Sequence, residues 1–132
     1  MAIGRGAGAA AGAGGTITIS DPLTISTGEV EFTTGTSAGN ITTGTIDGNT
    51  SIKFTSGTGT ISTGILGGGT ALTGLTYVGP QTLSSNITID GNVSITGATT
   101  LGADITIDTN STGTDGDITL GTVDGNQALT LD

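Results

Sequence analysis

Carboxylates are the side chains in this sequence with the most capacity for chemistry, and several gather near its C-terminus. Ca²⁺ prefers carboxylate and carbonyl oxygens, so this group supplies the candidate calcium ligands. Its members are Asp104, Asp108, Asp115, Asp117 and Asp124. The same residue type suits turns on a solvated face, and the GGxGxD repeat of calcium-binding β-rolls does not occur. We therefore expect no metal site and no cofactor, with calcium as the alternative.

The sequence contains few side chains that could act in catalysis. There is no His and no Cys, which excludes Ser-His and Cys-His nucleophilic arrangements. Asp115 and Asp117 form a carboxylate pair two residues apart, and in a strand they would face the same way. Polysaccharide-cleaving β-helix enzymes add basic residues to such acids, whereas Lys and Arg together number 2 here. We expect a protein that is not an enzyme and has no catalytic residue.

Charge and hydrophobicity argue against two further properties. The formal net charge is −9, and two cations cannot coat a phosphate backbone, so we expect no nucleic-acid binding. No run of 18 apolar residues occurs, so we expect no membrane span.

Several asparagines lie in sequence motifs that accept N-linked glycans. Five Asn-x-Ser/Thr sequons begin at Asn40, Asn49, Asn86, Asn92 and Asn110. A turn Asn that leads into a Thr-rich strand produces such sequons without any selection for glycans. In a source that glycosylates surface proteins, these corners would be accessible acceptors.

The elements that must position these residues are short strands. Between residues 86 and 109, three-residue strand cores begin at Ile87, Val93, Thr99 and Ile105, each six residues after the last. A fixed short period of strand and corner indicates a β-solenoid. The corners at 46–49, 89–92 and 123–126 contain Asp-Gly-Asn and could equally be hairpin turns. An antiparallel β-sandwich is therefore the alternative fold.

Alternation of Ile, Leu or Val with Thr extends the pattern through residues 16–132, the expected solenoid domain. In the strand at 51–54, Ile52 and Phe54 should point inward and Lys53 outward. The Gly-rich run at 67–69 should form a loop or bulge. Residues 1–15 are rich in Gly and Ala and form a separate N-terminal segment, expected to contact another subunit.

The C-terminal stretch GADITIDTNSTGTDGDITLGTVDGNQALTLD, residues 102–132, resembles repeats of filamentous-haemagglutinin-type bacterial adhesins and large β-strand-repeat exoproteins. The resemblance extends over residues 16–132 and implies a right-handed parallel β-helix of about nineteen residues per coil. It also implies a structural role in an extracellular or cell-surface shaft.

A short solenoid has two open ends that can satisfy each other. We therefore expect a homopolymer that grows head to tail as an extracellular fibre with a surface or adhesive role. The expected contacts are Gly6, Ala7, Gly8 and Ala9 at one end and Leu129 and Leu131 at the other.

The competing function is a binding module for surface glycans or for ice. Regular Thr-x-Thr rows on a flat solenoid face are similar to those of ice-binding proteins. The pairs that fit this pattern are Thr16/Thr18, Thr34/Thr36 and Thr58/Thr60, although Thr also suits any exposed strand position.

Overall fold

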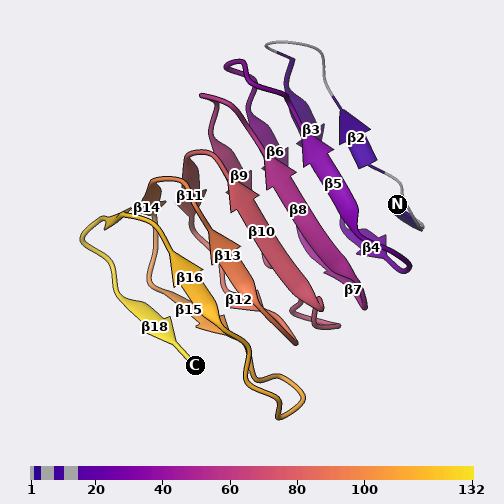
Figure 1. Ribbon diagram of the computed structural model, residues 1–132, viewed down its shortest axis with the longest axis vertical. Helices are drawn as coiled ribbons and strands as arrows, with labels where there is room; N and C mark the ends of the chain where they lie inside the picture. The colour runs from indigo at the N-terminus through magenta and orange to yellow at the C-terminus, as the bar shows by residue number, and fades with distance from the viewer. Residues whose placement is uncertain (1, 4–7, 11–14) are drawn as a thin grey trace.

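The protein is a parallel β-solenoid, as the six-residue spacing predicts. The computed structural model describes residues 2–3, 8–10 and 15–132, and within them it contains strands and turns but no helix (Figure 1). Every strand pair in the described chain is parallel, so the alternative antiparallel sandwich is wrong.

Three sheets run along the stack, and the chain visits each of them once per coil. Sheet B contains β2 (Gly8–Ala10), β5 (Val30–Thr33), β8 (Ser51–Thr55), β10 (Gly74–Val78), β13 (Val93–Ile95) and β16 (Ile118–Leu120). Sheet C contains β3 (Ile17–Ile19), β6 (Ile41–Thr43), β9 (Ile61–Thr63), β11 (Gln81–Leu83), β14 (Thr99–Leu101) and β17 (Val123–Asp124). With six strands in each of these sheets, about five turns separate the first strand from the last.

Sheet A is built in two parts joined through a single residue. It contains β1 (Ala2–Ile3), β4 (Leu23–Ile25), β7 (Ile46–Gly48), β12 (Ile87–Thr88), β15 (Ile105–Asp108) and β18 (Leu129–Leu131). Leu66 bridges β7 to β12 through its pairing with Ile46 and Ile87. The glycine run at 67–69 follows this bridge and forms no strand, as predicted.

Coil length varies, and the predicted six-residue spacing marks the shortest coil. β12, β13, β14 and β15 begin at the predicted residues and lie in sheets A, B, C and A in turn. Three faces of six residues give the offset of 18 between Tyr77 and Ile95. The next pairing in sheet B, Ile95 with Leu120, has an offset of 25, because residues 109–117 loop out before β16.

Alternate residues of each strand fill the interior. Ile52 and Phe54 are buried, and the Lys53 side chain between them is 35% exposed, as predicted. An aromatic stack runs through three coils. The ring centroids of Phe32 and Phe54 lie 5.6 Å apart, and those of Phe54 and Tyr77 lie 5.2 Å apart. Stacked rings of this kind add to the stabilisation that burial gives.

Glycine permits the close approach of successive corners. The Asp-Gly corners end in Gly48, Gly91 and Gly125, with φ of 153°, 152° and 137°, where a side chain would be strained. These corners turn the chain from one parallel strand to the next within a coil and close no hairpin. At Gly59, a Cβ atom would collide with the backbone of Gly39 one coil earlier.

Two strands fall within the Gly/Ala-rich N-terminal segment. β1 pairs with β4, and β2 pairs with β5, with Ala9 opposite Phe32. Gly8 and Ala9 thus lie on the outer strand of sheet B, whereas Gly6 and Ala7 lie outside the described residues.

Candidate functional site

Sheet C presents a continuous row of hydroxyl groups. Each three-residue strand of this sheet has one outward residue at its centre, and the strand register places these residues beside one another. The row consists of Thr18, Thr42, Ser62, Thr82 and Thr100, here called the hydroxyl ladder. Asp124 follows Thr100 and ends the ladder with a charge.

The sequence pattern missed most of this ladder. Of the residues in the predicted Thr-x-Thr pairs, Thr18 belongs to it, whereas Thr34 is fully buried and cannot face a ligand. Thr34 instead donates a hydrogen bond of 2.9 Å from Oγ1 to the carbonyl of Gly39, which closes a corner. Apolar-flanked triplets do not locate the ladder either: Thr18 has isoleucine on both sides, whereas each of the other four residues has Thr or Gln on one side.

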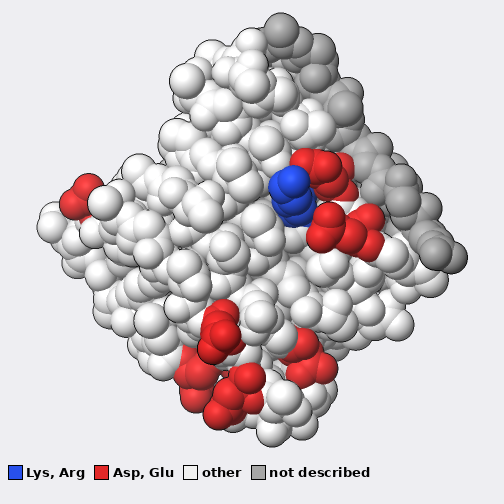
Figure 2. Space-filling view, viewed as in Figure 1, with Lys and Arg blue, Asp and Glu red and all other residues white. Residues whose placement is uncertain are grey.

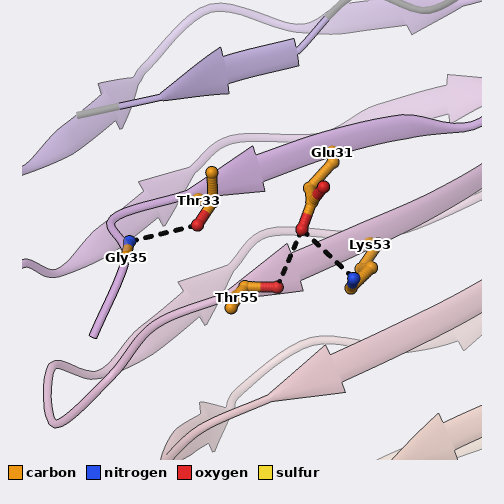
Figure 3. A network of polar contacts seen from close by, with 5 residues as sticks. All are labelled: Glu31, Thr33, Gly35, Lys53 and Thr55. Carbon is orange, nitrogen blue, oxygen red and sulfur yellow. Dashed lines mark hydrogen bonds and ion pairs between the residues drawn. The ribbon is translucent and has the colours of Figure 1, made fainter. Parts of the chain in front are cut away.

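Sheet B carries the basic charge of the described chain. The Nζ atom of Lys53 lies 3.2 Å from Oε1 of Glu31 on the neighbouring strand, and Thr55 donates a hydrogen bond of 3.1 Å to the same carboxylate oxygen (Figure 3). Both charged side chains are partly exposed, so this pair adds little to stability. Figure 2 shows basic side-chain atoms next to acidic ones on a largely uncharged face.

The candidate calcium ligands are spread over different parts of the stack. Asp108 lies on β15 of sheet A and Asp124 on β17 of sheet C, while Asp115 and Asp117 lie in or beside the loop before β16. Asp104 Oδ1 accepts a hydrogen bond of 2.8 Å from the backbone N–H of Ala128. In the described part of the chain, no three His, Cys, Asp or Glu side chains come together in a group that could hold a metal ion.

Three of the sequon asparagines connect successive coils. In each case Oδ1 accepts a hydrogen bond of 2.9 Å from a backbone N–H one coil later: Asn40 from Thr60, Asn86 from Thr106 and Asn92 from Asp117. The side chain thereby supplies a hydrogen-bond acceptor at a corner, where the backbone hydrogen bonds between neighbouring strands begin. All five sequon asparagines, Asn40, Asn49, Asn86, Asn92 and Asn110, are exposed.

The last coil, β16 to β18, has a poorly covered interior face. Leu131 is 50% exposed and Val123 is 36% exposed, while Leu129 is half-buried. Each of these strands is the outermost strand of its sheet. The two predicted C-terminal contact residues, Leu129 and Leu131, therefore lie on an open edge of sheet A.

Comparison of the chain with protein-family models, curated proteins and solved structures found no match. Among the described residues, no helix is long and apolar enough to cross a membrane.

Proposed function

We propose that this chain is a structural subunit or segment of an extracellular protein fibre, with copies joined head to tail through the ends of the solenoid. The fibre would have a surface or adhesive role, in keeping with the resemblance of residues 102–132 to adhesin-shaft repeats. One observation carries the proposal: the last coil exposes apolar side chains whose counterparts one coil earlier are buried.

Paired residues of the last two coils differ greatly in their exposed fraction. Ile107 is fully buried, whereas Leu131, its partner in sheet A, is 50% exposed. Thr99 is 2% exposed, whereas its partner Val123 in sheet C is 36% exposed. Another coil stacked on this edge would bury these residues, and burial contributes about 25 cal/mol for each Å² of apolar surface removed from water.

The strands at the two ends of the stack run in the same direction, so the ends of two copies could pair. β2 and β18 lie at opposite ends of the stack (Figure 1). All strands of a sheet are parallel, so β16, β17 and β18 of one copy could pair with β2, β3 and β1 of the next in the same sense. A head-to-tail contact of this kind does not close on itself and therefore produces a filament.

Two valines allow a matched test. Val123 is 36% exposed on the open edge, and Val78 is 37% exposed at the end of β10, in the middle of the stack. A charge at Val123 would have to be buried at a head-to-tail contact, whereas a charge at Val78 would stay in water. Sedimentation velocity and negative-stain imaging at rising protein concentration should show filaments for the unmodified chain and for Val78→Lys, and monomers for Val123→Lys.

A second pair of variants distinguishes a loss of association from a loss of the fold. Leu131 and Ile65 are 50% and 46% exposed, on the open edge and in mid-stack respectively. Leu131→Lys should abolish association and Ile65→Lys should not, with circular dichroism spectra that match the unmodified chain. A compact monomer at high concentration, or equal loss in edge and mid-stack variants, would overturn the proposal.

A further inference from the structure

The hydroxyl ladder is regular along the axis of the solenoid. Neighbouring strands of a sheet lie about 4.8 Å apart, so the ladder repeats at about that interval through five coils. The repeat is close to the spacing of oxygen rows on the surface of hexagonal ice. Thr16 and Thr60 lie two residues before Thr18 and Ser62, and add part of a second row about 6.6 Å away along the strands.

Small residues border the ladder on one flank. One residue after each of the first five strands of sheet C, the chain has a glycine or a serine, so this flank of the ladder carries only small side chains. These positions are Ser20, Gly44, Gly64, Ser84 and Gly102. From Thr18 to Thr100 the ladder has no charged member, in contrast to sheet B with Glu31 and Lys53.

The ladder hydroxyls are available to an external partner. None of the five makes a hydrogen bond to another protein group within the described residues, whereas the hydroxyls of Thr34, Thr50 and Thr109 bond to backbone carbonyls. Each ladder residue stands at the centre of a strand that is paired with neighbouring strands. The array is therefore held in place before any ligand arrives, which lowers the ordering cost of binding.

We propose that the hydroxyl ladder of sheet C is an ice-binding face. Its hydroxyl groups and the methyl groups of its threonines would organise water in the pattern of the ice lattice along a row without charged members. The ladder lies within a single molecule, so this inference does not depend on polymerisation.

Crystalline polysaccharide is a different occupant, and the burial of aromatic residues argues against it. Sugar rings bind by stacking on exposed aromatic side chains, which offer an apolar face beside polar groups. The chain contains 2 Phe, 1 Tyr and no Trp. Phe32, Phe54 and Tyr77 are all fully buried, so sheet C has no aromatic platform.

The test compares two threonines of the same coil. Thr82 is the ladder residue of β11, and Thr76 is the central outward residue of β10 in sheet B; both are half-buried. Tyrosine suits an exposed strand position, so Thr82→Tyr and Thr76→Tyr should both fold. Thermal hysteresis and partitioning into a growing ice hemisphere should be retained by the unmodified chain and Thr76→Tyr, and mostly lost by Thr82→Tyr.

A second ladder variant, Thr42→Tyr in β6, should show the same loss, and thermal melting should confirm that each variant is folded. The proposal is overturned if the unmodified chain shows neither hysteresis nor partitioning into ice. It is also overturned if Thr76→Tyr loses as much activity as Thr82→Tyr. Binding to cellulose or chitin particles without activity on ice would assign the face to a polysaccharide instead.

Discussion

The hydroxyl groups of Thr63 and Tyr77 lie 2.7 Å apart inside the solenoid, where they form a hydrogen bond between sheets C and B. Tyr77 is fully buried at the end of the aromatic stack. Burial raises the pKa of its phenol well above the ordinary value, and the hydrogen bond with Thr63 offsets part of that effect. The fold therefore holds Tyr77 in its neutral form.

This environment predicts a loss of stability at alkaline pH. The folded-state pKa of Tyr77 is raised, so its contribution is complete below the unfolded-state pKa of about 10 and declines as the pH rises above it. Urea denaturation at about pH 8 and about pH 11 should show this fall. Tyr77→Phe should be less stable at neutral pH by about 1 kcal/mol, because Thr63 loses its partner, but should show a smaller alkaline loss. An equal alkaline loss in Tyr77→Phe would contradict the prediction.

Asn86 should stabilise the stack through its side chain. Asn86→Ala removes the acceptor for the backbone N–H of Thr106, at an expected cost of about 0.5–1.5 kcal/mol in the free energy of unfolding. Asn49 provides the control, since it is an exposed sequon asparagine whose side chain makes no hydrogen bond to any other described residue. Asn49→Ala should change stability by less than about 0.5 kcal/mol. Equal effects of the two substitutions in urea denaturation would argue against the role of Asn86.

Two glycines should differ sharply in their tolerance of alanine. Gly59→Ala places a methyl group against the backbone of Gly39, and we expect destabilisation of about 1–3 kcal/mol. At Gly74 the nearest atom to an added methyl group is Cβ of Ser51 at 3.4 Å, an ordinary contact. Gly74→Ala should therefore lie within about 0.5 kcal/mol of the unmodified chain. Thermal melting of both variants checks the contrast, which fails if Gly59→Ala is neutral.

The ion pair between Glu31 and Lys53 should contribute little. Their side chains are 42% and 35% exposed, and exposed pairs are worth about 0.2–1 kcal/mol. A double-mutant cycle with Glu31→Gln and Lys53→Met should give a coupling energy in that range, lower at high salt. The glutamine retains an oxygen that can accept the hydrogen bond from Thr55. A coupling energy well above 1 kcal/mol would show that the pair matters more than its exposure suggests.

The sequence predicts the fold well wherever the coil is shortest. From Ile87 to Ile105 each face receives one six-residue unit, so the period is visible and the first residues of four strands were predicted correctly. Alternation also placed Ile52, Lys53 and Phe54 on the correct sides of β8. In both cases the structure follows from local geometry, because strands alternate sides with a period of two.

The hydroxyl ladder could not be predicted in the same way. Its members are separated along the chain by 24, 20, 20 and 18 residues, from Thr18 through Thr42, Ser62 and Thr82 to Thr100. The variation comes from corners of different lengths, which set the register only after the coil has closed. The Thr-x-Thr pattern predicts an outward Thr34, whereas this side chain points inward and closes one of those corners.

The strict nearest-neighbour pairing of coils has a mechanical consequence. Each strand bonds only to strands one turn away, so tension applied along the axis would detach the outermost turn without loosening the others. A turn of 18 residues occupies about 4.8 Å of the stack but spans about 60 Å when extended. The molecule would therefore unfold stepwise under tension, one turn at a time. Each step would lengthen the chain by many times the height of a folded turn.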